Sequence, residues 1–548
     1  MKYEIIDVDA LGRIGEITIK NKKMITPNLF PVVHPFKNII SPSELKNFGA
    51  EAIFTNAYTI YQNEKLREEL ISKGIHDHLD FNGFIATDSG AFQQYMYNDK
   101  EFDISPDEIE SFQEKISSDF PVILDIPVQL DDDHDVAKKK VEHTISRARD
   151  NINRRINQEC HWIGPIHGGK FLDLLKYSAT EMCKLDFDLY AIGGLVKPAT
   201  EYRFDLLIKI LLNVRKYFSP NKPLHMFGLG LPQFFSLAVA CGCDLMDSAA
   251  YILYANEQRY FTLSTGTKRL EELIEFPCHC PICSQYTPNE VRGFQKPLQV
   301  ELVAKHNLYI SFSELKTIRQ AIREGNLWEL VETRVRSHPN LVKAVHVLKE
   351  NGTLLETHEK VYKNHGRLFC SSLALYRPIL QRYQVKLEQN YRVPKDAKYL
   401  ILLPELDVKG PNSPSISKWL DEINNNELIP RSNLHVAFIC DFFGIIPLEL
   451  IDTFPMGQYE AIDSITEYDI VFHDSIEKIE KFFQSHSMHY DKCGILIPNK
   501  YMSQFGEFIE FPAAHPIQGL HSKLMTKFNL QNSIFKNIEK LLNYFKVD

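Results

Sequence analysis

A repeated pattern in the first half of the chain constrains its fold more than any other feature. Short apolar runs rich in β-prone residues end in glycine or aspartate, and a polar, helix-like segment follows each of them. Six clear runs are GFIATDSGAF (83–92), FPVILDIP (120–127), WIGPIHGG (162–169), LYAIGGLV (189–196), LHMFGLGLP (224–232) and CDLMDSAAY (243–251), and two earlier runs of the same kind are LFPVVHP (29–35) and AEAIFTNAY (50–58). Apolar runs bounded by Gly and Pro are typical of strands buried in a parallel sheet.

Strands that alternate with helices form βα units, and this alternation predicts an α/β fold. Eight such units suit a TIM (β/α)8 barrel, in which the active site lies at the carboxyl ends of the strands. The polar residues of the runs stand at those ends. An open, doubly wound sheet is the competing fold, and the number of strands alone does not exclude it.

The second half of the chain has a different pattern. Apolar residues at three- and four-residue spacing predict helices over 310–385. Strand-like runs at 397–406, 434–447 and 493–498 predict a smaller α/β domain, with a linker at 387–398 and an amphipathic helix from about Leu520. We therefore expect the 548 residues to form a first domain over 1–345, a helical connector over 346–396 and an α/β domain over 397–548.

A cluster of thiols follows the last of the apolar runs. Cys278, Cys280 and Cys283 lie within six residues, and His306 comes after 22 intervening residues. Structural zinc takes four Cys or His ligands in a tetrahedron, so these four residues predict one Zn²⁺ ion with a closed, structural shell. His279 is the alternative fourth ligand. The other seven of the ten cysteines are scattered, as expected of small buried side chains in a reducing compartment.

Targeting signals and net charge limit where the protein can be located and which partners it can bind. The first residues, MKYEIIDVDA, lack the basic start and apolar run of a signal peptide. No stretch approaches the ~18 apolar residues that span a bilayer, so we expect a cytoplasmic protein without membrane contact. The net charge of −9 argues mildly against nucleic acid, because phosphate contacts favour basic surfaces. A local strip is either an RNA-binding surface or a solvated helix face, and it consists of Lys138, Lys139, Lys140, Arg147, Arg149, Arg154 and Arg155.

Three aspartates, Asp88, Asp125 and Asp247, end apolar runs. A carboxylate at a buried strand end costs desolvation energy unless something satisfies it, and any single one could simply cap the next helix. Three at equivalent strand ends favour a shared polar pocket. Two carboxylates around a glycosidic bond support a double displacement, in which one attacks C1′ of the sugar and the other moves the proton. Water must be excluded so that a new base attacks the intermediate instead.

Several ordered motifs resemble those of tRNA-guanine transglycosylases. They are TDSGAFQ (87–93), LDIP (124–127), GG (168–169), AIGG (191–194), FGLG (227–230), DLMDSA (244–249) and CHCPIC with HNLY (278–309), and DALGRIG (9–15) and AIREGNLWELVE (321–332) are similar to the archaeal branch in particular. The resemblance covers roughly residues 1–345. It implies that this region is the catalytic TIM barrel, with a zinc subdomain inserted at about 276–310.

The resemblance also implies an activity and a set of roles. The expected reaction exchanges a D-loop guanine of tRNA, at position 15, for 7-cyano-7-deazaguanine on the way to archaeosine, and guanine itself is the other expected base. Asp247 would be the nucleophile, Asp88 the general acid and base, and Asp125 the partner of the incoming base's polar edge. The rest of the base pocket would comprise Ser89, Phe92, Gln93, His167, Gly194, Leu195, Val196 and Phe227, with the two phenylalanines stacked on the base ring.

Two positions depart from the family pattern. His167 stands where the family usually has Gln before the Gly-Gly pair. A histidine can also donate to the guanine carbonyl, and the other interpretation is an altered specificity or a decayed site. Leu231 stands where the family usually has a polar residue, and a leucine side chain cannot make the polar contact of that residue.

Residues of about 397–475 resemble the core domain of archaeosine synthases, on the motifs LLP (402–404) and FGIIPLEL (443–450) and on Tyr459. The synthase motif has a Cys and a His after LeuPro, whereas this chain has Glu405, Lys409, Gly410 and Pro411 in that stretch. We interpret the domain as a degenerate synthase core that positions tRNA or serves as a scaffold. The sequence shows no clear C-terminal RNA-binding module, so a homodimer and a separate RNA-binding partner chain are both open.

Three functions are therefore compared. An active transglycosylase fits the motifs best. The missing Cys in 404–411 argues against an archaeosine synthase-like enzyme. Retention of the three aspartates argues against a catalytically silent tRNA-binding subunit, because unused buried carboxylates cost stability.

Overall fold

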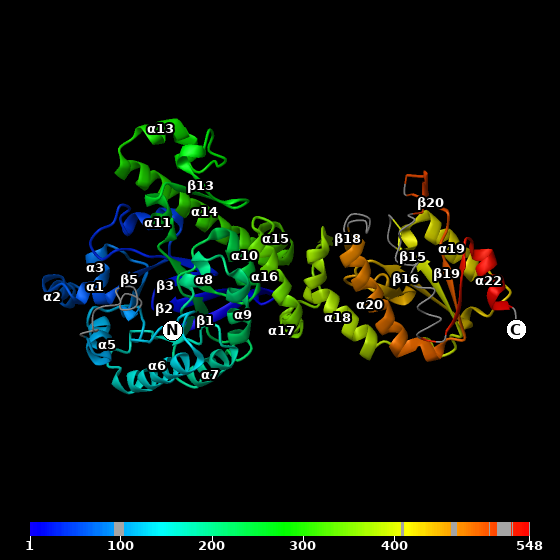
Figure 1. Cartoon of the computed structure of the whole chain (residues 1–548), viewed down its shortest axis with the longest axis horizontal. Coiled ribbons are helices and arrows are strands. Elements are labelled where there is room, and N and C mark those ends of the chain that lie inside the picture. The colour runs from blue at the N-terminus through cyan, green and yellow to red at the C-terminus, as the bar shows by residue number, and fades with distance from the viewer. Residues whose placement is uncertain are drawn as a thin grey trace. The chain divides into compact units, whose positions relative to one another are not determined.

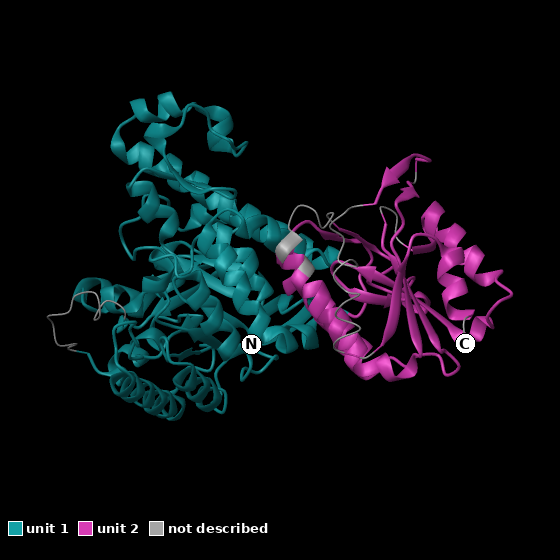
Figure 2. Cartoon of the chain, turned by 45° about the vertical axis from the view of Figure 1, so that its right-hand side comes forward, with its two compact units in different colours: residues 1–360 teal, residues 361–548 magenta. Residues whose placement is uncertain are grey.

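The chain folds as two compact units, Met1–Lys360 and Val361–Asp548 (Figure 2). The computed structural model describes residues 1–91, 104–406, 410–461, 468–503, 505–511, 528 and 530–546. Both units mix helices with parallel sheets, so the predicted α/β class is confirmed (Figure 1). No helix in these ranges is both long and apolar enough to cross a membrane.

Two parallel sheets form the centre of the first unit. One has the order β4-β11-β10-β9-β8 and the other the order β5-β6-β7. Their strands are β4 (Asn28–Pro31), β5 (Ala52–Asn56), β6 (Phe84–Asp88), β7 (Phe120–Pro121), β8 (Ile163–Ile166), β9 (Leu189–Ile192), β10 (Leu224–Met226) and β11 (Leu245–Ser248). Single parallel bridges join Val32 to Phe54 and Val122 to Ile163. Each strand coincides with one of the eight apolar runs, and only β4 begins one residue before its run, which confirms the prediction of parallel strands.

One hydrophobic cluster takes side chains from both sheets. Residues at alternate positions of a strand contribute to it, such as Ala52 and Phe54 on β5 and Leu189 and Ala191 on β9. Alternate residues of a strand point to the same face, so these strands turn one face toward a common core. An antiparallel sheet of β1 (Lys2–Asp9), β2 (Gly12–Ile19) and β3 (Lys22–Thr26) adds further residues to the cluster from β2 and β3.

Helices alternate with the strands of the first unit. They are α1 (Ala57–Tyr61), α2 (Glu64–Lys73), α3 (Ile75–Leu79), α5 (Pro106–Lys115), α6 (His134–Arg154), α7 (Leu172–Met182), α8 (Val196–Thr200), α9 (Phe204–Arg215), α10 (Pro232–Ala240) and α11 (Ala250–Asn256). Side-chain caps begin several of them: Ser105 and Glu108 form a capping box at α5, and Asp133 accepts from the Val136 amide at α6. Such local signals fix where these two helices begin.

The remaining elements of the first unit follow β11. They are β12 (Arg259–Thr262), β13 (Gly266–Arg269), α12 (Pro281–Gln285), α13 (Pro288–Gly293), α14 (Lys296–Glu324), α15 (Leu327–Val335), α16 (Pro339–His346) and α17 (Gly352–His358), with short 3-10 turns at 270–272 and 347–351. A further 3-10 turn, at 43–48, lies between β4 and β5. The 29-residue α14 is followed by Gly325, whose φ of 72° lies in the left-handed region that suits the residue capping a helix C-terminus.

The second unit is built on a five-stranded sheet of order β17-β16-β15-β19-β22. Its strands and helices are β14 (Arg367–Phe369), α18 (Pro378–Gln389), β15 (Tyr399–Pro404), α19 (Pro414–Asn424), β16 (Leu434–Cys440), β17 (Gly444–Pro447), β18 (Tyr459–Ala461), α20 (Tyr468–His486), β19 (Lys492–Leu496), β20 (Lys500–Met502), β21 (Phe508–Glu510), β22 (Gln531–Phe535) and α22 (Ile538–Lys546). Short 3-10 turns lie at 372–376, 410–412, 431–433, 448–450 and 487–489.

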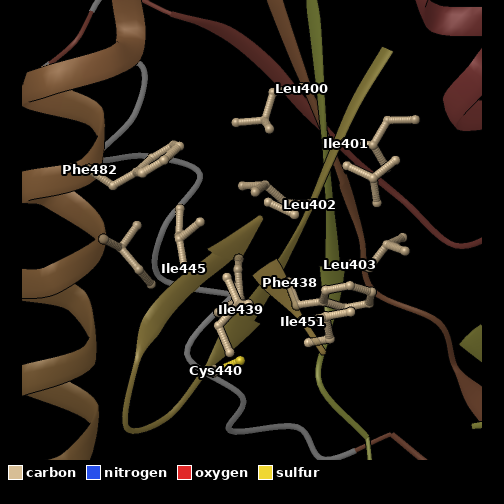
Figure 3. Close-up of a cluster of buried hydrophobic side chains, with 14 of the residues drawn as sticks. Leu400, Ile401, Leu402, Leu403, Phe438, Ile439, Cys440, Ile445, Ile451 and Phe482 are labelled. Carbon is tan, nitrogen blue, oxygen red and sulfur yellow. The ribbon is translucent and has the colours of Figure 1, made fainter. Parts of the chain in front are cut away.

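The core of this unit lies on both faces of its sheet. Leu400 to Leu403 on β15 are fully buried, and Figure 3 shows them beside Phe438 of β16 and Phe482 of α20. Helix α20 runs along one face of the sheet, and α19 and α22 cover the other (Figure 1). A strand that is covered on both faces reads as a continuous apolar run, which is why YLILLP predicts a strand.

Three predicted elements of the second half are wrong in part. The run 434–447 is a β16–β17 hairpin because the chain reverses before Gly444, which has a φ of 76°. Within the helix expected from about Leu520, Gln531–Phe535 is instead strand β22, which pairs in parallel with β19, and α22 begins at Ile538. Residues 520–527, 529 and 547–548 of that range lie outside the described residues. The helical prediction for 310–385 fails at β14, which pairs with β18. In each of the three cases, pairing with another strand sets the observed secondary structure.

The predicted connector, residues 346–396, spans the division between the two units. Helix α17 belongs to the first unit, and β14 and α18 belong to the second. Ile379 and Leu380 of α18 are buried in the same cluster as Leu400.

Candidate active site

The three predicted aspartates lie at the carboxyl ends of neighbouring strands. Asp88 is the last residue of β6, Asp247 is the penultimate residue of β11, and Asp125 follows β7 by four residues. They are close enough that the negative charges of Asp125 and Asp247 both act on the Asp88 carboxyl group. The structure therefore brings the three predicted carboxyl groups together.

Asp88 is held in a form suited to carrying a proton. Its Oδ2 accepts a hydrogen bond of 3.0 Å from Asn56 Nδ2, and its Oδ1 accepts one of 3.2 Å from the Gly90 amide. Burial first, and then the charges of Asp125 and Asp247, raise the pKa of Asp88 to about 7. A carboxyl group with this pKa exchanges a proton near neutral pH.

Asp125 is paired with His167. The Asp125 Oδ2 and His167 Nε2 atoms are 2.5 Å apart, and both side chains are buried. The His167 amide donates to Ser178 Oγ, which fixes the backbone beside the ring. Gly193 leaves room for the imidazole, because a Cβ atom there would lie 2.2 Å from His167 Cε1. The residue that departs from the family pattern therefore fits its surroundings.

Asp247 is held through one of its two oxygens. Its Oδ1 lies 2.8 Å from His225 Nε2 and accepts a hydrogen bond of 3.2 Å from the Gly228 amide. Within the described ranges, Oδ2 has no hydrogen bond. Asp247 is only 8% exposed, so this free oxygen lies in a largely enclosed site.

The other predicted pocket residues are placed as follows. Ser89 is fully buried, and its hydroxyl donates to the Ile123 carbonyl, which ties the segment after β6 to the segment after β7. Gly194 has a φ of 76°, and a Cβ atom there would lie 2.7 Å from the Val128 carbonyl oxygen. Leu195 is buried, and Val196 begins α8. Phe92 and Gln93 lie outside the described residues.

Phe227 is partly exposed at the end of β10. Its ring meets the His225 ring edge-on at 4.9 Å and the Phe54 ring at 5.8 Å. Leu231, the second departure from the family pattern, directly precedes α10 and is half-buried.

Two residues that bind the aspartates were missed by the sequence analysis. Asn56 ends its apolar run just as the aspartates end theirs, so the same rule could have identified it. His225 stands inside its run, where a lone histidine among apolar residues is not distinguishable from a core residue.

The predicted metal ligands converge at a separate place in the first unit. The ligand atoms of Cys278, Cys280, Cys283 and His306 all lie within 4.8 Å of one another. His306 Nδ1 is 3.5 Å from Cys280 Sγ and 3.3 Å from Cys283 Sγ. His279, the alternative ligand, is exposed and is not part of the group. These four residues can hold a metal ion.

The surroundings of His306 fit a ligand role. Its Nε2 lies 3.0 Å from the Phe261 carbonyl oxygen, so this nitrogen donates and Nδ1 keeps the lone pair that faces the sulfurs. The Tyr260 ring stacks on the imidazole with 3.5 Å between centroids. Tetrahedral zinc, with Zn–S of about 2.3 Å and Zn–N of about 2.0 Å, sets sulfur and nitrogen ligands roughly 3.5 Å apart. The observed separations match this geometry.

The basic strip belongs to helix α6 and the residue that follows it. Most of its cations have acidic partners: Lys138 with Glu142, Lys140 with Asp132, Arg149 with Glu181, and Arg154 with Asp107 and Glu110. Arg147 instead donates to the Leu124 carbonyl. This pairing favours the interpretation as an ordinary helix face.

In the second unit, an acidic residue, Glu405, lies in the stretch that departs from the synthase motif, and it forms a hydrogen bond with Tyr459. The Tyr459 hydroxyl donates to Glu405 Oε1. Gly410 and Pro411 form a 3-10 turn before α19, and Lys409 lies outside the described residues.

Comparisons with known proteins agree with the motifs. A family model described as queuine tRNA-ribosyltransferase matches residues 8–340. Relatives named tRNA-guanine(15) transglycosylase include one from Methanocaldococcus jannaschii, 40% identical over 476 residues, which are 86% of this chain and 70% of the relative. One from Methanococcus maripaludis is 37% identical over 521 residues, which are 94% of this chain and 77% of the relative.

A third relative of the same name, from Methanobrevibacter smithii, is 37% identical over 495 residues, or 89% of this chain and 72% of the relative. The family match spans the three aspartates, the residues that hold them and the metal group. On these matches and this geometry, the chain is a transferase that belongs to the queuine tRNA-ribosyltransferase family of tRNA-guanine transglycosylases.

Proposed function

We propose that this chain exchanges the guanine at position 15 of tRNA for 7-cyano-7-deazaguanine through a covalent bond between Asp247 and ribose C1′. The observation that carries the proposal is the contrast between two neighbouring carboxyl groups. Asp88 has a pKa raised to about 7, whereas Asp247 has one oxygen anchored and one free. Relatives named for position 15 support that target.

The reaction has two displacements at ribose C1′, and the second restores the protonation and bonding state that the first changes. Asp247 Oδ2 forms a bond to C1′ as the bond between C1′ and N9 of guanine breaks, and the leaving base takes the proton of Asp88. The incoming base then returns its N9 proton to Asp88. Its N9 forms the new bond to C1′ as the ester bond to Asp247 breaks, so both carboxyl groups recover their initial states.

The base is held by groups on the remaining strand ends. Asp125 binds the polar edge of the base, and His167 orients that carboxylate through the 2.5 Å contact. Backbone groups of Gly194, Leu195 and Val196 read the carbonyl and the 7-substituent. The ring stacks between Phe92 and Phe227, which contributes about 1–3 kcal/mol, and Ser89 and Gln93 line the pocket.

The scaffold of this site is a closed TIM barrel over residues 1–345. Two bridges support closure, because they connect β4 to β5 and β7 to β8 and so join both ends of the two sheets. The shared hydrophobic cluster supports it as well. Residues 346–360 end the first unit, 361–396 pack into the second unit, and 397–548 form a degenerate synthase core that positions tRNA or serves as a scaffold.

One structural Zn²⁺ ion is held by Cys278, Cys280, Cys283 and His306. The convergence of the four ligand atoms and the donor set support this assignment. Four protein ligands leave no open position, so the ion stabilises the segment around α12 and takes no part in base exchange.

The tRNA partner is shared with the family, and the assembly that presents it is a homodimer or a complex with a separate RNA-binding chain. The synthase-like and silent-subunit alternatives receive less support, because Glu405 occupies the altered motif and the three aspartates are assembled.

Base exchange on a tRNA transcript tests the proposal. Purified chain, labelled guanine and tRNA should give label in the tRNA, and unlabelled 7-cyano-7-deazaguanine should compete with it. Asp247→Ala should abolish incorporation without changing the metal content. Incorporation that survives in Asp247→Ala would overturn the assignment of the nucleophile.

A further inference from the structure

His225 is buried inside the site and is not among the residues that the motifs single out. It lies in the middle of β10, and none of its surface is exposed. Its ring is surrounded by aromatic side chains: Phe30 at 5.4 Å, Phe54 at 6.1 Å and Phe227 at 4.9 Å, all edge-on. An imidazole in such apolar surroundings needs a hydrogen-bond partner to offset its desolvation.

Asp247 supplies that partner. His225 Nε2 lies 2.8 Å from Asp247 Oδ1, whereas His225 Nδ1 is buried and has no hydrogen bond to any described residue. A protonated ring would bury an N–H group without an acceptor at Nδ1, which is costly. The ring is therefore neutral, with its hydrogen on Nε2 and its lone pair on Nδ1.

We propose that His225 is a positioning residue that selects which oxygen of Asp247 attacks the ribose. Its Nε2–H and the Gly228 amide hold Oδ1, and this fixes the carboxylate plane and presents Oδ2 to C1′. A neutral donor orients the nucleophile without cancelling its charge. The inference rests on the proposed role of Asp247 and adds a residue that acts through it.

The position of His225 also connects the nucleophile with the base pocket. The same ring that holds Asp247 contacts Phe227, which is proposed to stack on the base. Packing that fixes the imidazole therefore fixes the distance between the stacked base and the attacking oxygen. Rates of this kind depend steeply on such geometry, and a misplacement of about 1 Å costs roughly 100-fold.

Two matched substitutions test the inference. His225→Gln keeps an N–H donor close to the position of Nε2, and His225→Met has nearly the same shape and no donor. The measurement is the single-turnover rate at which tRNA becomes covalently attached to the chain, with KM values for tRNA and base and the melting temperature measured in parallel. Asp247→Asn is the reference for loss of the nucleophile.

The expected result is a rate roughly 100-fold lower in His225→Met, with KM values within about threefold of wild type, and a rate within about tenfold of wild type in His225→Gln. A wild-type rate in folded His225→Met would overturn the inference and leave the role of Asp247 intact. Equal losses in both variants, matched by equal drops in melting temperature, would mean that His225 is only a core residue. Adduct formation by Asp247→Asn would instead overturn the proposed function.

Discussion

The carboxyl groups of Asp88, Asp125 and Asp247 are chemically identical, but their surroundings differ. Asp88 lies beside two other carboxyl groups and takes up a proton near neutral pH. Asp125 shares a short contact with His167, and Asp247 is anchored at one oxygen by His225. Pairs of titratable groups whose environments separate their proton affinities are the usual arrangement of acid and nucleophile in a single site.

The raised pKa of Asp88 predicts how the rate depends on pH. The ordinary pKa of 3.8 is raised to about 7, so Asp88 keeps its proton up to neutral pH and loses it above. The rate of covalent attachment of tRNA should therefore fall as the pH rises through about 7, tending to a tenfold loss for each further unit. A single-turnover profile from pH 5.5 to 9 measures this, and a rate that stays flat across that range would contradict the role of Asp88 as the acid.

The contact between His167 and Asp125 predicts an effect on base binding. Hydrogen bonds to charged groups contribute about 1.5–3 kcal/mol, so His167→Ala should raise the KM for the incoming base roughly 10- to 100-fold and change kcat far less. His167→Gln, which restores the usual residue of the family, is the matched control and should bind the base nearly as well as wild type. An unchanged KM in His167→Ala would show that Asp125 needs no partner.

In the first unit, the three aspartates of the candidate site lie at the ends of strands, and the apolar residues of the core lie within them. The DLMDSA motif shows this within a few residues. Asp244 precedes β11, is fully buried and forms a two-point ion pair with Arg13, at 2.7 and 2.6 Å. Asp247 lies near the other end of the same strand and faces the site. Both residues are aspartates of one motif, so residue type does not separate the ion-pair partner Asp244 from the site residue Asp247. Their positions at opposite ends of β11 do.

The sequence predicted those elements whose own residues show how they are buried. The eight runs predicted eight strands because buried parallel strands are continuously apolar. The strand β22 was mistaken for helix because its environment comes from pairing with β19, which no local pattern reveals. His225 was missed for the same reason, since its function depends on Asp247, 22 residues further on.

The metal group predicts a local effect of metal removal. The ligands tie the turn before α12 to the middle of α14, so chelation should expose residues 270–296 to protease while the second unit stays intact. Cys283→Ser should lower the bound zinc in the same way. Cys370→Ser, at an exposed cysteine outside the group, is the control. Unchanged zinc content in Cys283→Ser would contradict the assigned ligand set.

The two compact units of the molecule have separate hydrophobic cores. The hydrophobic cluster of the second unit takes its residues only from 369–545. The three aspartates, their partners and the metal group all lie in the first unit. A chain built in this way can separate the chemistry of base exchange from the positioning of a large RNA.

This division predicts the behaviour of a shortened chain. Residues 1–360 should bind zinc and attach tRNA covalently at saturating tRNA within about threefold of the full rate, with a KM for tRNA raised roughly tenfold, or about 1.4 kcal/mol. Residues 361–548 should fold alone and show a cooperative melting transition. A folded 1–360 fragment that forms no adduct at any tRNA concentration would place part of the active site in the second unit.

In the proposed mechanism, Asp247 carries the tRNA between the two displacements. The most direct measurement is peptide mapping by mass spectrometry of chain that has been denatured during turnover with tRNA and digested with nuclease and protease. A ribose-linked fragment is expected on the peptide that contains Asp247, and no such fragment is expected from Asp247→Asn. Attachment at Asp88 or Asp125, or steady base exchange with no covalent species, would contradict this mechanism.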